Sequence, residues 1–190
     1  MQPRSYRLGR RQVAADRTRA AILSTARELL TSGNDPSISV GAVARRAGVS
    51  RLTIYNRFGS KAGLLQAVLD DARRRSPAPS ADTAGNPRAQ LSQRLSESCV
   101  RWASDPSLFR RLPELDLAEN ESPGADRALA EQLAAADHLR PGCSLKEAED
   151  VIGMLTSFAT FDRLHKDGRR SAIAVADILV RLAGAILASA

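Results

Sequence analysis

The chain has 190 residues and a formal net charge of +7, and 43% of its residues are hydrophobic. That length suits one medium domain, or a small domain joined to a larger one, and the apolar content excludes a chain that is disordered throughout. The charge is uneven, because residues 1–75 hold 15 Lys and Arg against 5 Asp and Glu, whereas residues 76–190 hold 13 against 16. A basic excess at one end predicts that this end meets a polyanion.

Neither a secretory signal nor a membrane span is expected, so the predicted location is the cytoplasm. The first 15 residues are rich in arginine and lack an apolar run. The most apolar segment, Ala172–Ala190, contains Asp177 and Arg181 four residues apart, and an ion pair at that spacing favours a buried helix. In such a compartment Cys99 and Cys143, which are far apart in the sequence, are not expected to form a structural disulfide.

Helical signals recur along the N-terminal part, and sustained period-two alternation is absent. We therefore predict an all-α protein of about nine helices, with a three-helix helix-turn-helix head on a larger C-terminal helical bundle. Residues 1–15 are interpreted as a disordered basic arm and residues 16–75 as the head domain. Serine N-caps and glycine stops predict helices over Asp16–Thr31, Val40–Ala47, Arg51–Phe58 and from Ser60 to about Arg75.

Residues 76–86, rich in Pro, Ala and Ser, are interpreted as a linker, and residues 87–190 as the larger bundle. Pro residues at first helical positions and a capping box at Ser144 and Glu147 mark the helix starts. The expected helices begin at Pro87, at Asp105-Pro106, at Ser122-Pro123 with an end before Pro141-Gly142, at Ser144 with an end at His165–Gly168, and at Ser171 with an end at Ser189.

The segment Val43–Phe58 carries the most informative pattern. Ala44 supplies the small residue that a tight helix crossing needs, and Gly48, four positions on, tolerates the positive φ of a sharp turn. Ile54, ten positions after Ala44, supplies a branched side chain for the shared core. This spacing, within the basic part of the chain, predicts a DNA-binding helix-turn-helix. The alternative is an ordinary pair of short core helices.

Around this motif the sequence resembles the N-terminal signature of the TetR family of transcriptional regulators, over roughly residues 17–69. Ala42, Gly59 and Gly63 depart from the commoner residues of the family, and glycine at the last two positions predicts a looser start of the fourth helix. The residues that carry the resemblance are Thr18, Arg19, Ile22, Leu23, Gly48, Val49, Ser50, Thr53, Ile54, Tyr55, Phe58, Ser60, Lys61, Leu64 and Leu65.

The resemblance implies that the helix Arg51–Phe58 enters the major groove of DNA. Arg pairs with guanine, Asn with adenine, and Leu or Thr meets a thymine methyl group. Tyr55 and Lys61 match family positions that bind phosphate, although packing and a solvated charge are the respective alternatives. The arginines of residues 1–15 are expected to contact DNA or to form a solvated tail. The expected DNA-binding residues are Ser39, Arg51, Leu52, Thr53, Tyr55, Asn56, Arg57 and Lys61.

The last helix is apolar on most of its sides and therefore needs several packing partners. Its small residues Ala176, Val180, Gly184 and Ala188 recur at i,i+4 spacing. The resemblance implies that the last two helices pair with those of a second subunit, giving a homodimer that binds a palindromic operator in double-stranded DNA. A helix buried wholly within one chain is the alternative.

The resemblance also implies a small-molecule pocket within residues 87–165 whose occupancy releases DNA. Because the candidate lining has few charged groups, the expected effector is largely apolar. Met and aromatic residues make adaptable pocket walls, although such a stripe is also typical of plain core. The candidate ligand-binding residues are Trp102, Phe109, His138, Met154, Phe158, Phe161 and Asp162.

The predicted function is thus a ligand-released repressor, and the alternative is a DNA-binding protein without a sensor. Catalysis is not expected, since the sequence has no nucleophile elbow, phosphate-cradling glycine loop or Cys-x-x-Cys. His138 and Cys143 supply only two candidate ligands, so neither a metal nor a cofactor is expected.

Overall fold

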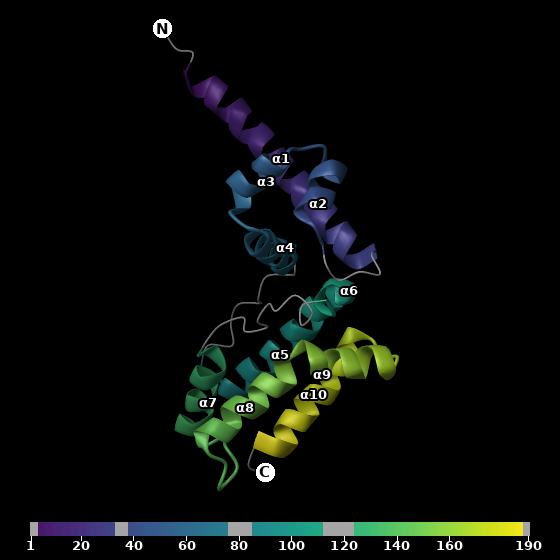
Figure 1. Ribbon diagram of the computed structural model, residues 1–190. Coiled ribbons are helices and arrows are strands. Elements are labelled where there is room, and N and C mark those ends of the chain that lie inside the picture. Colours follow the sequence, from purple (N-terminus) through teal and green to yellow (C-terminus); the bar gives the residue numbers. More distant parts are fainter. Residues whose placement is uncertain (1–3, 33–37, 76–84, 112–123, 188–190) are drawn as a thin grey trace. The chain divides into compact units, whose positions relative to one another are not determined.

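The computed structural model describes residues 4–32, 38–75, 85–111 and 124–187, and every regular element among them is helical (Figure 1). The all-α prediction is confirmed, with ten α-helices and one π-helical turn in these ranges where about nine helices were predicted. The described residues fall into two compact units. The first takes in those up to Arg74 together with Arg111, and the second takes in the others.

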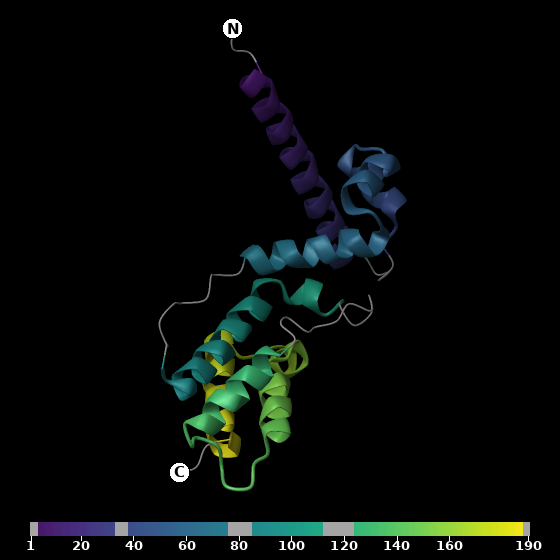
Figure 2. The ribbon, with the colours of Figure 1, turned by 90° about the vertical axis from the view of Figure 1, so that its left-hand side faces the viewer.

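Helix α1 spans Arg4–Ser32 as one continuous helix (Figure 2). The predicted disorder is therefore wrong for residues 4–15, while residues 1–3 lie outside the described part. Arg, Leu, Gln and Ala dominate this segment, and all four have high helix propensity. The Gln12 side chain also donates a hydrogen bond to the Asp16 carboxylate over 3.1 Å, one helical turn away. A high density of arginine thus indicated charge but not disorder.

Three further helices of the first unit lie where the sequence predicts them. They are α2 (Val40–Ala47), α3 (Arg51–Phe58) and α4 (Lys61–Arg75). A serine precedes each one and accepts a backbone N–H bond within the first turn, which stabilises a helix by about 1 kcal/mol. The capping pairs are Ser39 with Ala42, Ser50 with Thr53, and Ser60 with Gly63, each at 3.0 Å.

The turn between α2 and α3 depends on Gly48, which has a φ of 67°. The Val49 N–H donates to the Ala44 carbonyl over 3.0 Å and closes the end of α2. Ile54 of α3 is fully buried, as are Val43 of α2 and Ile22 of α1. These side chains form the core that holds the two helices of the motif, so the predicted helix-turn-helix core is present.

Gly63 tightens the start of α4 rather than loosening it. A Cβ atom at this position would overlap the backbone carbonyl oxygen of Phe58, at the end of α3. Gly59, between the two helices, has a φ of 74°, a value that favours glycine. Gly63 therefore permits a close approach of backbone to backbone that a larger residue would prevent, and Gly59 permits the positive φ between α3 and α4.

The second unit is a helical bundle in which α5 packs against α7, α8, α9 and α10 (Figure 1). The predicted start at Ser122-Pro123 lies outside the described residues, and α7 ends well before Pro141. The elements are α5 (Pro87–Ser104), α6 (Pro106–Phe109), α7 (Ala125–Ala135), α8 (Leu145–Thr156), α9 (Phe158–Asp162), a π-helical turn (Arg163–Asp167) and α10 (Ala172–Leu187).

The single long helix predicted after Ser144 is wrong, because the chain breaks at Ser157. This residue has extended backbone angles, and its side chain accepts a hydrogen bond from the Thr160 N–H over 3.3 Å, so it caps α9. The carbonyl of Thr156 at the break accepts a 2.9 Å hydrogen bond from the indole N–H of Trp102 on α5. A serine that competes for backbone hydrogen bonds, together with a distant donor, stabilises the interruption.

Helix α10 buries one face and exposes the other. Ala176 is buried within its own chain, Val180 is half-buried, Gly184 is exposed, and Ala188 lies outside the described residues. The small-residue stripe therefore packs partly inside one subunit, as the intramolecular alternative proposes.

In the described part of the chain, no helix combines the length and apolar character needed to cross a bilayer.

Candidate nucleic-acid interface

Helix α3 presents a polar and apolar mixture to solvent on the side away from Ile54. Leu52 is 67% exposed although it is a large apolar residue in a well-formed helix. Asn56 is also exposed, as are most of the other predicted contact residues. An exposed leucine among hydrogen-bonding side chains suits a surface that meets both base edges and thymine methyl groups. The exposed set on α3 is Arg51, Leu52, Tyr55, Asn56 and Arg57, and Thr53 is half-buried.

Two of the predicted residues also have local structural roles. The Thr53 hydroxyl lies 2.8 Å from that of Ser50, and its backbone N–H is the one that Ser50 caps. The exposed Ser39 accepts a hydrogen bond from Ala42, and its O–H remains able to donate to a phosphate. A Cβ at Gly41 would meet the Arg51 guanidinium at 2.8 Å, so Arg51 lies across the start of α2. The structure thus places Arg51 beside the start of α2, which Ser39 caps.

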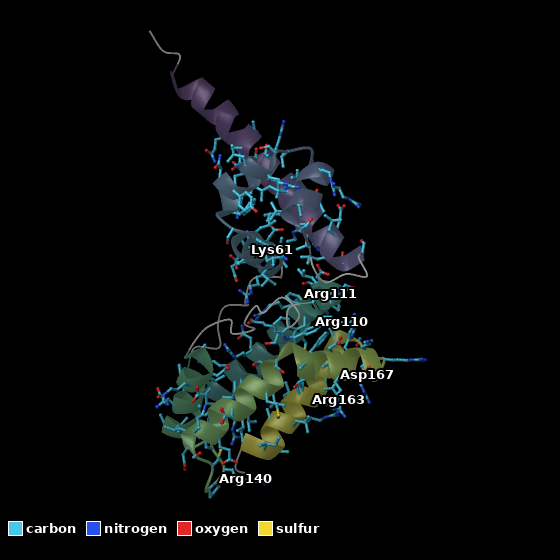
Figure 3. The ribbon with its side chains drawn as sticks, in the orientation of Figure 1. Lys61, Arg110, Arg111, Arg140, Arg163 and Asp167 are labelled. Carbon is cyan, nitrogen blue, oxygen red and sulfur yellow. The ribbon has the colours of Figure 1, made fainter. Side chains whose placement is uncertain are left out.

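Lys61 is exposed at the first position of α4 (Figure 3). The start of a helix carries free N–H groups and a partial positive charge, which favour a phosphate. A lysine in that position adds a flexible cation. Tyr55 is exposed as well, which disfavours the alternative that it is plain core.

Arg19 is one of the residues that carry the family resemblance, but the sequence did not predict its structural role. Its guanidinium lies 5.1 Å from the centre of the Phe58 ring, a cation–π contact that ties the end of α3 to α1. Arg46 of α2 forms an exposed 3.4 Å ion pair with Glu28 of α1. That pair favours a role for Arg46 on the solvated face of the head.

Comparison with known proteins identifies the type of DNA-binding domain in the first unit. Residues 22–68 match the family model described as bacterial regulatory proteins, tetR family. The HTH-type transcriptional regulator AlkX of Mycobacterium tuberculosis is 48% identical over 48 residues, which are 25% of this chain and 23% of that protein. The regulator EthR of Mycolicibacterium smegmatis is 42% identical over 64 residues, 33% of this chain and 30% of that protein. Residues 22–68 therefore form a DNA-binding domain of the tetR-family type.

Solved structures of TetR-type regulators extend the likeness of fold to most of the chain. The secondary repressor NalD of Pseudomonas aeruginosa has a TM-score of 0.64 at 22% identity, with 92% of this chain and 98% of that chain covered. TylP of Streptomyces fradiae has a TM-score of 0.61 at 20% identity, with 92% and 88% covered. The sequence matches, in contrast, span less than a third of the curated relatives' lengths.

In the second unit, four of the predicted ligand-binding residues form an aromatic cluster. The Trp102 ring centroid lies 4.8 Å from that of Phe109 and 5.6 Å from that of Phe158, both in edge-to-face geometry. Phe161 lies 6.4 Å from Phe158, and all four side chains are buried. Such contacts add about 0.5–1.5 kcal/mol per pair beyond area burial. Each ring thus has ring neighbours, as the core alternative requires.

The other three candidates are separated from this cluster or engaged elsewhere. Met154 is 52% exposed on α8. The Asp162 carboxylate accepts hydrogen bonds of 3.0 and 2.7 Å from the Arg110 guanidinium, and these bonds raise the pKa of Arg110 above its usual value. His138 lines a cavity of about 190 Å³ between α5, α7 and α10.

Burial raises the pKa of the Cys99 thiol to about 11, so this cysteine stays protonated at neutral pH.

Proposed function

We propose that this chain is a ligand-released homodimeric repressor that binds a palindromic operator in the cytoplasm and has no enzymatic activity of its own. Residues 16–75 act as the DNA-binding domain, and residues 87–190 bind the effector and a second subunit. The observation that carries the proposal is the exposed set on α3, which combines Arg, Asn and Leu opposite a fully buried Ile54. Its chemistry is that of side chains that distinguish base edges in a major groove.

Substitutions in α3 and at Lys61 of α4 are expected to separate base contacts from phosphate contacts. Asn56→Ala or Arg51→Ala should cost ~1–3 kcal/mol on the operator and much less on random DNA, since each removes a contact to a base edge. Lys61→Ala should weaken both DNAs alike and reduce the slope of log affinity against log salt by about one. The operator is first selected from a random DNA pool, and affinities are then measured by fluorescence anisotropy between 50 and 200 mM salt.

Arg163→Ala serves as the matched control, because Arg163 is exposed on the second unit and far from α3 in the sequence. It should leave both affinities unchanged. Equal losses on operator and random DNA for Asn56→Ala, Arg51→Ala and Lys61→Ala would contradict base readout by α3.

Dimerisation is proposed to use the apolar side chains that α8 and α10 leave exposed. The two helices contact each other, and Met154 of α8 and Leu182 of α10 are 52% and 41% exposed. Ile178 lies one turn before Leu182 and is half-buried. Large apolar residues that protrude from neighbouring helices are typical of an interface that a second subunit covers. A two-fold dimer of this kind matches a palindromic operator.

Leu182→Glu is expected to turn the dimer into a monomer at micromolar concentration, because the change places a charge in the apolar centre of the interface. Arg181→Glu introduces the same side chain one residue earlier, about 100° around the helix, and should leave the dimer intact. Sedimentation equilibrium measures both. A monomeric unmodified protein, or a dimeric Leu182→Glu variant, would contradict the proposed interface.

Release by an effector is supported by the names of relatives of similar fold. NalD is described as the secondary repressor of a multidrug efflux pump, and another neighbour as controlling antibiotic production by bacterial hormones. A regulator without a sensor is the second candidate, and it predicts that no small molecule changes operator affinity.

A further inference from the structure

The side chain of Arg51, the first residue of α3, lies over the first turn of α2. Side chains of a helix lean toward its N-terminus, so a long side chain at this position reaches back to the preceding helix. A Cβ atom on Gly41, the second residue of α2, would lie 2.8 Å from Nη2 of Arg51, 3.1 Å from Nε and 3.2 Å from Cζ. The guanidinium therefore occupies the space that a side chain at position 41 would fill.

The backbone at Gly41 does not itself require glycine. Gly41 is helical, and its φ is not among the positive values of the described chain. The three atoms nearest to an added Cβ all belong to the Arg51 guanidinium. Alanine at a helical position is more favourable than glycine, because glycine loses more conformational freedom on folding. Glycine at position 41 thus disfavours the helix and, in return, leaves space for one arginine.

The Arg51 guanidinium is exposed, and within the described ranges it has no hydrogen-bond or ion-pair partner. Arg46 of α2, in contrast, forms an ion pair with Glu28. The N–H donors of Arg51 are therefore free to form the bidentate contact that arginine makes with guanine. The space over Gly41, and no bond to another residue, determines where these donors lie.

We infer that Gly41 is a positioning residue for DNA recognition: its lack of a side chain places the Arg51 guanidinium where it reads one G·C base pair of the operator. A side chain at position 41 displaces the guanidinium. The displaced group is the end of a flexible side chain, so the helix-turn-helix remains folded. The inference rests on the proposed operator binding by α3 and names what determines specificity at one position.

Gly41→Ala tests the inference by fluorescence anisotropy on the operator and on operators with single base-pair changes. Arg51→Ala should reduce the preference for guanine at one position by about 5- to 150-fold. Gly41→Ala should lose most of the same preference at the same position, while its melting temperature stays equal or rises. The double variant should lose no more than Arg51→Ala alone, since both changes remove one contact.

Arg57→Ala is the matched control, because Arg57 is exposed on the same helix about 9 Å further along. Its effect should add to that of Gly41→Ala, since the two residues share no contact. A Gly41→Ala variant that keeps the guanine preference would overturn the inference. A double variant of Gly41→Ala and Arg51→Ala that shows the full product of the two single losses would do the same.

NMR of the unmodified protein without DNA tests the contact itself. Nuclear Overhauser effects between the Hα protons of Gly41 and the side-chain protons of Arg51 are expected, and their absence would overturn the inference whatever the variants show. Failure of the unmodified protein to select any operator from a random DNA pool would contradict the proposed function. A selected operator whose guanine preference survives Gly41→Ala would contradict only the role of Gly41.

Discussion

Ile54→Ala is expected to lower the free energy of unfolding of the first unit by about 2–5 kcal/mol, the range for truncating a large buried aliphatic side chain. Ile54 is fully buried in the core that α3 shares with α2. A small unit has a low free energy of unfolding, so a loss of this size leaves a large fraction of the molecules with this unit unfolded. Operator affinity should fall on that account alone, because the motif no longer holds α3 in place.

Leu52→Ala is the matched control on the same helix. Leu52 is 67% exposed, so its truncation should change stability by no more than about 0.5 kcal/mol and still weaken operator binding. Backbone amide exchange in residues 38–75 reports the first unit, and the fluorescence of Trp102, the only tryptophan, reports the second. Unchanged amide protection in Ile54→Ala would contradict the assigned core.

Trp102→Ala is expected to cost the second unit about 3–5 kcal/mol, since it removes the largest ring of the aromatic cluster. The same change leaves the Thr156 carbonyl without the indole N–H that bonds to it. That bond satisfies the end of α8 at the Ser157 break, so the loss should be greatest where α8 meets α9. Trp102→Phe keeps a ring and removes the donor, so its smaller cost isolates the hydrogen bond.

Val100→Ala provides the control, because Val100 lies on the same helix and is 42% exposed. Its effect should stay within about 0.5 kcal/mol. Denaturant unfolding followed by far-UV circular dichroism measures all three variants without a tryptophan signal. If Trp102→Ala were no more destabilising than Val100→Ala, the cluster would not be part of the core.

Local signals in the sequence determined the helix-turn-helix of the first unit. Ser39 and Ser50 cap their helices, Gly48 permits the turn, and Ala44 and Ile54 have the spacing of a helix crossing. All of these act over at most ten residues, so composition and order suffice to specify them. The exposed side of α3 follows from the same pattern, because buried Ile54 and half-buried Phe58 define the opposite face of this short helix.

Only the tertiary structure decided the break at Ser157, the use of the aromatic residues and the position of His138. A capping box predicted one long helix, but the carbonyl freed at Thr156 is satisfied by Trp102, which is 54 residues away. The same aromatic spacing suits a pocket wall or a core, and only the structure shows that rings of α5, α6 and α9 contact one another. His138 became a cavity residue because Leu133 and Leu187 hold its loop. Contacts between distant segments leave no periodic trace in a sequence, and for that reason they appear only when the helices are packed.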